Sequence, residues 1–346
     1  MPGVAENALE VGSAASALSD DQTILVNLET TASCGFSKTC GPRCLLNQLN
    51  SRAGAPLTRF DVLCVADEII SSPASHHVRH MCALGKEVME DADTLFEITR
   101  MWHEAPATGR PGALGIITAS ASGLKRHARE FARFPISWIV ISLDVSSVGL
   151  RSPANEQPLL ASALLVRATG GTEALGVNTL LTPDNLSEVI ALGRRVEKGQ
   201  IDQWSLGPFL APATNGLLRP VVRRDDYRRA IERVVAEFGD SRMRILFDLD
   251  YSELLALVGD KIRLKPAGKA WRYEYAVTEN IKLAALNQQP FFFMRSRWDG
   301  QILAKADFKV IGLEQGTYGR WQPGRVVELL QQFVSQQELM IPTEAG

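Results

Sequence analysis

The chain has 346 residues, of which 45% are hydrophobic and 22% are charged, the balance of an ordinary globular protein. Its formal net charge of -2 gives no electrostatic reason to expect nucleic acid as a partner. No apolar run approaches the ~20 residues that a membrane span needs, and no signal peptide is recognisable, so we expect a cytoplasmic protein without a membrane partner.

The chain divides by composition into three parts. Residues 1–21 are rich in alanine, serine, glycine and acidic side chains, which is typical of a mobile tail. Residues 22–214 alternate strand-like and helix-like segments and form the expected main domain. Residues 215–346 lose that alternation, and we interpret them as an extension that covers the substrate.

Six short apolar, β-branched runs alternate with longer amphipathic stretches in the main domain. In chain order they are Thr23–Glu29, His77–Leu84, Leu114–Thr118, Trp138–Leu143, Ala174–Leu181 and Trp204–Leu210. Strands that alternate with helices indicate parallel strands joined by crossovers. Six such units fit an α/β fold, a partial (β/α)6 TIM-like barrel with a C-terminal α+β extension. A doubly wound sheet has the same alternation, so periodicity leaves both architectures open.

Helices are predicted between these strands at Glu90–His103, Leu124–Phe131, Pro158–Ala168 and Pro183–Lys198. The last is expected to begin with Thr182 as its cap and Pro183 in its first turn. Each predicted strand ends in a polar cluster. Because ligands of parallel α/β architectures bind at the carboxyl ends of the strands, we expect the functional site there.

The extension is predicted to contain both helices and strands. A charged amphipathic helix is expected over residues 219–236, and a hairpin over residues 291–311 that turns at Asp299-Gly300. The remaining predicted elements are the strand Met243–Leu249 and the helices Tyr251–Val258 and Arg325–Phe333.

Three of the five cysteines are bunched directly after the first predicted strand. Cys34, Cys40 and Cys44 are separated by five and three residues, and the glycines and proline between them allow a tight loop around one metal centre. Thiolates hold iron–sulfur clusters, and three ligands leave one iron open to a small molecule. The alternative from the cysteines alone is a zinc site completed by one of three histidines, His76, His77 or His80.

Further landmarks follow in order. The second strand is followed by Gly85-Lys86-Glu87, a later strand reads Ile141-Ser142-Leu143-Asp144, and the next contains Val177-Asn178-Thr179. With the cysteine segment, these landmarks make residues 22–214 resemble the radical S-adenosylmethionine (radical SAM) superfamily. The resemblance implies an enzyme with a partial barrel that uses a [4Fe–4S] cluster and S-adenosyl-L-methionine.

Two features depart from the family pattern. The usual spacing is Cys-x3-Cys-x2-Cys, whereas this chain has five and three intervening residues. The position before the last cysteine, commonly an aromatic residue that contacts adenine, is Arg43, and Phe36 is the candidate substitute. The unusual spacing raises the alternative that a different S–C bond of the cofactor is cleaved.

The resemblance also implies roles for residues outside the cysteine segment. Glu87 would accept the cofactor's ammonium group, Gly85 would allow close backbone approach, and Arg151 would bind the carboxylate. Ser142 and Asp144 would hydrogen-bond the ribose. The remaining candidates near the cofactor are Lys86, Thr118, Ser120 and Asn178. For each, an ordinary loop, strand-end or surface role is the alternative.

Two cysteines lie outside the cluster segment. Cys64 is interpreted as a core residue, and Cys82 as a core residue or a catalytic donor of a hydrogen atom to the substrate. No cysteine follows Cys82, so we expect no auxiliary cluster, which favours a small-molecule substrate, such as one of secondary metabolism, over a peptide. A one-electron reductant such as flavodoxin or ferredoxin is the expected partner. The competing functions are a zinc-dependent barrel hydrolase and a metal-stabilised binding module.

Overall fold

The structure is a computed structural model that describes residues 24–31, 58–85, 87–143, 153–212 and 218–248, together with short segments between residues 263 and 331. The cysteine segment, Lys86, Asp144, Arg151, the N-terminal tail and the predicted helix Tyr251–Val258 lie outside the described residues. No helix of the described part is long and apolar enough to cross a membrane.

All six strands predicted for the main domain are present. They are β1 (Ile24–Thr31), β2 (Val78–Gly85), β3 (Ala113–Thr118), β4 (Ile136–Ser142), β5 (Thr172–Leu181) and β6 (Gln203–Pro208). Each pairs in parallel with the next, so their order in the sheet follows the sequence without a reversal. A doubly wound sheet reverses its strand order, so the sequence-ordered sheet excludes that alternative.

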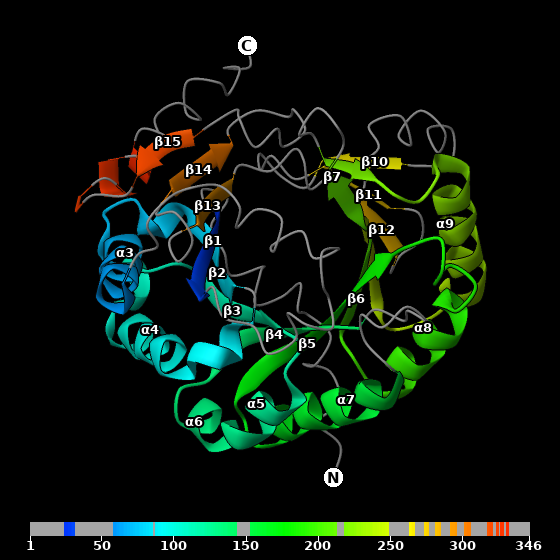
Figure 1. The fold of residues 1–346 in the computed structure, drawn as a ribbon, viewed down its shortest axis with the longest axis horizontal. Helices are drawn as coiled ribbons and strands as arrows, with labels where there is room; N and C mark the ends of the chain where they lie inside the picture. Colours follow the sequence, from blue (N-terminus) through cyan, green and yellow to red (C-terminus); the bar gives the residue numbers. More distant parts are fainter. Residues whose placement is uncertain are drawn as a thin grey trace.

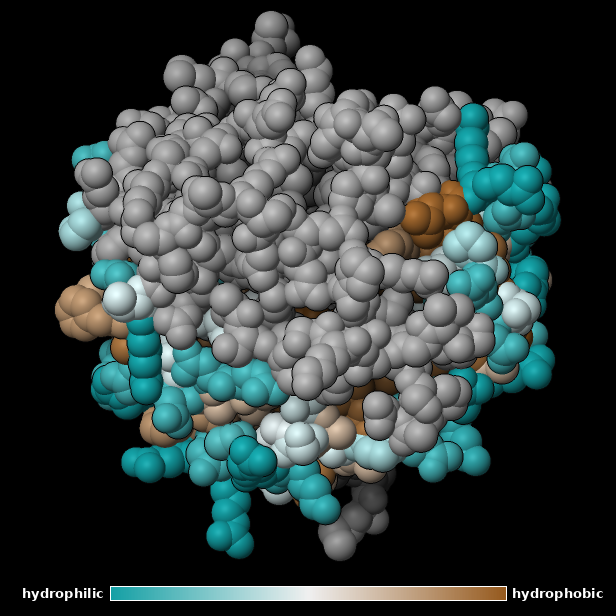
Figure 2. All heavy atoms as spheres, in the orientation of Figure 1, coloured by the Kyte–Doolittle hydropathy of each residue, from teal (hydrophilic) through white to brown (hydrophobic). Residues whose placement is uncertain are grey.

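Helices connect these strands on the outer side of the curved sheet (Figure 1). They are α3 (Arg59–Ser71), α4 (Ala92–Glu104), α5 (Ala121–Arg126), α6 (Ala128–Arg133), α7 (Pro153–Ala168), α8 (Val189–Lys198) and α9 (Arg224–Phe238). Three short 3₁₀ turns complete the connections, η2 (Ser75–His77), η3 (Val88–Asp91) and η4 (Ala107–Gly109). Charged and polar side chains cover much of the described periphery in Figure 2. The fold is therefore the predicted α/β partial barrel, with an open sheet.

The start of α8 was predicted wrongly. Thr182 does not cap a helix; instead its backbone N–H donates to Asn185 Oδ1 at 2.8 Å, while Asn185 Nδ2 donates to the Leu180 carbonyl at 2.8 Å. The Asn185 side chain thereby fixes a turn after β5, and the helix begins only at Val189. An asparagine side chain that bonds nearby backbone competes with helix formation, which explains the delay.

The C-terminal part contributes strands to the same sheet. They are β9 (Arg244–Asp248), β10 (Arg263–Pro266), β11 (Tyr273–Ala276), β12 (Ile281–Ala284), β13 (Phe291–Arg295), β14 (Gln301–Lys305) and β15 (Thr317–Arg320). Two short strands, β7 (Leu210–Pro212) and β8 (Leu218–Pro220), instead pair with each other in a separate two-stranded sheet. β9 extends the sheet in parallel beside β6, and β13 does so beside β1. β13 and β14 pair antiparallel, as the predicted hairpin requires, although its turn lies outside the described residues. The domain boundary near residue 214 stays a prediction.

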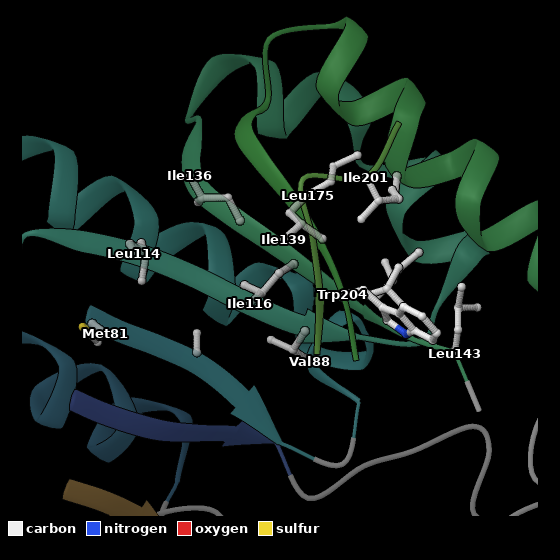
Figure 3. Close-up of a cluster of buried hydrophobic side chains, with 14 of the residues drawn as sticks. Met81, Val88, Leu114, Ile116, Ile136, Ile139, Leu143, Leu175, Ile201 and Trp204 are labelled. Carbon is white, nitrogen blue, oxygen red and sulfur yellow. The ribbon is translucent and has the colours of Figure 1, made fainter. Parts of the chain in front are cut away.

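The apolar core lies between the sheet and the outer helices. Along β4, Ile139 and Ile141 are fully buried in this layer, whereas Trp138, Val140 and Ser142 on the opposite, inner face are half-buried. Figure 3 draws part of this core, with side chains from β2 to β6 in one layer. The alternation leaves the inner face of the sheet as the surface on which polar side chains gather near the strand ends.

Candidate functional site

The described candidates gather at the carboxyl ends of neighbouring strands. Gly85 ends β2, Thr118 ends β3, Ser142 ends β4, and Asn178 lies near the end of β5. The cysteine segment begins three residues after Thr31, the last residue of β1, which pairs with Gly85. The described candidates thus lie at one edge of one sheet, the edge at which β1 ends before the cysteine segment begins in the chain.

Glu87 accepts three hydrogen bonds from neighbouring protein groups. The residue is only 2% exposed. Oε1 accepts hydrogen bonds from Thr118 Oγ1 at 2.5 Å and Met89 N at 3.2 Å, and Oε2 accepts one from Ala119 N at 2.9 Å. Glu87 therefore joins the loop after β2 to the loop after β3. This gives it a structural role, while its contact with a cofactor stays a prediction.

Thr118 and Ser120 both serve the loop after β3. The Thr118 hydroxyl accepts a hydrogen bond from Ser120 N at 3.0 Å, and Ser120 Oγ caps α5 by accepting from Gly123 N at 3.1 Å. Both side chains are buried. Their described partners are protein groups, so direct contact with a cofactor stays a prediction for each.

Gly85 is required by the packing of β1 against β2. A Cβ atom at this position would lie 2.5 Å from the Thr31 carbonyl oxygen, closer than real Cβ contacts allow. The close approach coincides with an irregularity in the register of the two strands. Glycine at position 85 thus has a structural explanation, the close packing of β1 and β2, in addition to the expected close approach to a cofactor.

The ends of β4 and β5 are tied together by a short chain of hydrogen bonds. Ser142 and Asn178 are register partners, both half-buried, and Leu143 N donates to the Asn178 carbonyl at 2.9 Å. The Thr179 hydroxyl donates to the Leu143 carbonyl at 2.8 Å and accepts from Trp204 Nε1 at 3.0 Å. These bonds hold the strand end that immediately precedes Asp144.

Cys82 lies on the inner face of β2, in register with Asn27 of β1 and Gly115 of β3. Its side chain is 4% exposed, and burial raises the pKa of the Cys82 thiol far above its ordinary value. The raised pKa makes Cys82 a neutral thiol at physiological pH.

Cys64, on α3, is half-buried and packs against the core, as predicted.

We expect Cys82 to resist alkylation in the native protein. Only the thiolate reacts readily, and burial keeps Cys82 protonated, so iodoacetamide should leave it unmodified between pH 7 and 9. In denaturant the same residue should be labelled within the reaction time. Peptide mass spectrometry of both samples measures the difference. Equal labelling in native and denatured protein would show that the thiol is accessible and ionised.

One aromatic residue of the inner face was missed by sequence reasoning. Trp138 places its indole over Gly115, where a Cβ atom would lie 2.0 Å from the ring, and its edge faces the His80 ring with centroids 6.5 Å apart. This pair has no local sequence signal, because Gly115 and Trp138 are neighbours only through the pairing of their strands. It cannot be recognised before the register of β3 and β4 is known.

The histidines considered for a zinc site lie toward the wrong end of the barrel. His76 and His77 precede β2, whose first residue pairs with Ile24 at the start of β1. The cysteine segment follows the opposite end of β1, and seven strand steps separate the two ends by roughly 23 Å. Among the described residues no group of three metal-ligating side chains is found. His80 pairs with Leu25, also near the start of β1, so zinc ligation by any of the three histidines together with Cys34 is disfavoured.

Comparisons with known proteins bear on the fold. No family model matches the sequence, and no curated protein sequence is significantly similar to it. SuiB from Streptococcus suis is similar in structure with a TM-score of 0.56 at 14% identity, over 93% of this chain and 69% of SuiB. SuiB bound to S-adenosylmethionine gives 0.54 at 14% identity, over 89% of this chain and 64% of that one.

A second similar structure is anSMEcpe with bound AdoMet, which is S-adenosylmethionine. It gives a TM-score of 0.56 at 10% identity, over 91% of this chain and 83% of that one. At such identities the similarity defines the fold alone. The chain has the partial-barrel fold of proteins whose structures contain S-adenosylmethionine, which is the fold that the sequence resemblance to radical SAM enzymes implies.

Proposed function

We propose that this protein is a radical SAM enzyme that acts on an organic substrate. The observation that carries the proposal is the segment with Cys34, Cys40 and Cys44, which directly follows β1 in a partial barrel. The fold shared with S-adenosylmethionine-bound structures supports it. The position of the segment, at the end of the first barrel strand, is the position that the family resemblance requires.

The residues present fit a [4Fe–4S] cluster by the chemistry of their donors. Three thiols within one short segment match the thiolate ligands that such clusters need, and they leave one iron for a small molecule. When bound, the reduced cluster would supply one electron to cleave S-adenosylmethionine to methionine and a 5′-deoxyadenosyl radical that abstracts hydrogen from the substrate. A flavodoxin or ferredoxin would be a suitable electron donor.

The barrel residues would bind and orient the cofactor. Glu87 offers a buried carboxylate just after β2, the strand that pairs with β1, and a carboxylate suits the ammonium group of S-adenosylmethionine. Ser142, half-buried at the end of β4, offers a hydroxyl for the ribose, and Asn178 offers a half-buried amide on the neighbouring strand as a further contact. Lys86, Asp144 and Arg151 complete the proposed contacts from the adjoining segments.

Cys82 is proposed to return a hydrogen atom to the substrate radical. This role needs an intact S–H bond, and the raised pKa of the buried thiol keeps that bond intact. Its place on the inner face of the sheet, between Asn27 and Gly115 in register, directs it toward the space enclosed by the strands. Simple packing in the barrel is the alternative role.

The substrate is proposed to be a small molecule, because no cysteine follows Cys82 and auxiliary clusters are therefore not expected. A peptide is the second candidate, and a specific observation favours it. Structures similar to this chain include SuiB bound to precursor peptide SuiA, at a TM-score of 0.50, and anSMEcpe with the Kp18Cys peptide, at 0.53. Transfer of deuterium from a labelled candidate substrate into 5′-deoxyadenosine would distinguish the two classes.

Binding of S-adenosylmethionine tests the cofactor part of the proposal. Glu87→Ala is expected to weaken binding by about 1–3 kcal/mol, or roughly 5- to 150-fold, because a charge-assisted hydrogen bond to the ammonium group is lost. Titration calorimetry of the reconstituted protein measures the Kd. Glu97→Ala, which removes a carboxylate paired with Arg100 on α4, is the control and should change nothing. Unchanged affinity in Glu87→Ala would remove Glu87 from the site.

A further inference from the structure

The hydroxyl of Thr118 has its proton direction fixed by its surroundings. Ser120 N–H donates to Thr118 Oγ1 at 3.0 Å, so the hydroxyl serves that bond as acceptor. Its own proton is then directed at Glu87 Oε1, 2.5 Å away. A hydroxyl can accept one hydrogen bond and donate another. Thr118 therefore links the backbone at the start of α5 to the Glu87 carboxylate.

The Glu87 carboxylate, which accepts this hydrogen bond, is held from two sides. Met89 N–H approaches Oε1 from the η3 turn, and Ala119 N–H approaches Oε2 from the loop after β3. Of these three donors only Thr118 donates from a side chain, so it is the one that substitution can remove without altering the backbone. Hydrogen bonds to a carboxylate from neutral donors stabilise its ionised form and fix the orientation of its plane.

The two loops that Glu87 joins are also packed tightly against each other. A Cβ atom on Gly123 of α5 would lie 2.6 Å from Met89 Cβ, so only glycine permits this approach of α5 to η3. Glu87 and Thr118 therefore belong to one closely packed, hydrogen-bonded unit that follows the ends of β2 and β3. That unit stands at the carboxyl edge of the sheet, beside the strand that leads into the cysteine segment.

We propose that Thr118 is a positioning residue that orients the Glu87 carboxylate for the ammonium group of S-adenosylmethionine. The proposal rests on the function proposed above and changes the expected role of Thr118 from direct cofactor contact to support of Glu87. Thr118 is 2% exposed and would affect the cofactor only through its hydrogen bond to the Glu87 carboxylate.

The test compares Thr118→Val, which keeps the shape and removes the hydroxyl, with Thr118→Ser, which keeps the hydroxyl. Two probes are titrated into each reconstituted protein: S-adenosylmethionine, and methylthioadenosine, which lacks the amino-acid moiety. Thr118→Val should weaken S-adenosylmethionine about tenfold and leave methylthioadenosine within about twofold. Thr118→Ser should bind both as the wild type does. In a Glu87→Gln background, Thr118→Val should have no further effect on S-adenosylmethionine.

Thr99→Val is the matched control, because Thr99 is a buried threonine of α4 whose hydroxyl donates to the Leu95 carbonyl at 2.8 Å. It should leave both affinities unchanged. If Thr118→Val does not fold, Thr118→Ala carries the same expectation. Unchanged S-adenosylmethionine affinity without the hydroxyl, or equal weakening of both probes, overturns the proposal while the proposed function stands. A wild-type protein with a full cluster that binds no S-adenosylmethionine overturns both.

Discussion

Replacing Cys34, Cys40 or Cys44 by alanine, one at a time, is expected to abolish cluster binding. Anaerobic reconstitution of the wild-type chain should give about four irons and four sulfides per chain, with the broad visible absorption of a cubane cluster. On the proposed assignment each thiolate would supply one of three protein ligands, and no other cysteine lies in that segment to replace a lost one. Iron and sulfide analysis with an absorption spectrum measures the result.

Cys64→Ala is the matched control for these variants. Cys64 packs against the core from α3 and should leave the iron and sulfide content at the wild-type level. Stoichiometric zinc in the wild-type protein, without visible absorption, would contradict the cluster assignment. Full iron content after loss of any one of the three cysteines would show that the cluster is held elsewhere.

Trp204→Ala should cause the largest loss of stability among single substitutions in the described barrel. Trp204 is completely buried on β6 and packs edge-to-face against Phe238 of α9, with ring centroids 5.8 Å apart. Gly193 of α8 leaves room for the indole, since a Cβ there would lie 2.5 Å from the ring. Removing such a side chain typically costs about 3–5 kcal/mol. The free energy of unfolding from denaturant titration measures the loss.

Phe60→Ala provides the comparison for that measurement. Phe60 lies at the start of α3 and is 74% exposed, so its removal should change the free energy of unfolding by less than about 0.5 kcal/mol. A Trp204→Ala variant as stable as Phe60→Ala would mean that Trp204 does not join α8 and α9 to the sheet. The comparison therefore tests the packing of the outer helices.

The sequence was sufficient to predict the strands of the barrel, because buried parallel strands are short apolar runs whose neighbours in the chain are helices. It failed at the start of α8, where a side-chain bond from Asn185 fixes a turn that propensity does not reveal. The strand pairings of β9 with β6 and of β13 with β1 were also not predicted. Such pairings join residues far apart in the chain, and only the tertiary structure specifies them.

The candidate site was predictable in position more than in detail. Motif order placed Glu87 and Asn178, and the polar cluster after the third predicted strand placed Thr118, at or just after the strand ends where the structure has them. The bond between Thr118 and Glu87 was not predicted, because their 31-residue separation gives no local sequence signal. The same holds for Trp138 over Gly115, which depends on the register of two strands. The cysteine segment itself rests on sequence, and its ligand roles stay predictions.

Identification of the nucleoside released from S-adenosylmethionine tests the proposed function most directly. The reconstituted, reduced protein is incubated with S-adenosylmethionine, and the products are separated and identified by mass spectrometry, with the three cysteine variants as blanks. We predict methionine and 5′-deoxyadenosine from the wild type and neither from the variants. Methylthioadenosine with an aminocarboxypropyl product would mean that the unusual cysteine spacing redirects cleavage, and S-adenosylhomocysteine with a methylated product and no 5′-deoxyadenosine would mean methyl transfer. Either result would contradict the deoxyadenosyl mechanism.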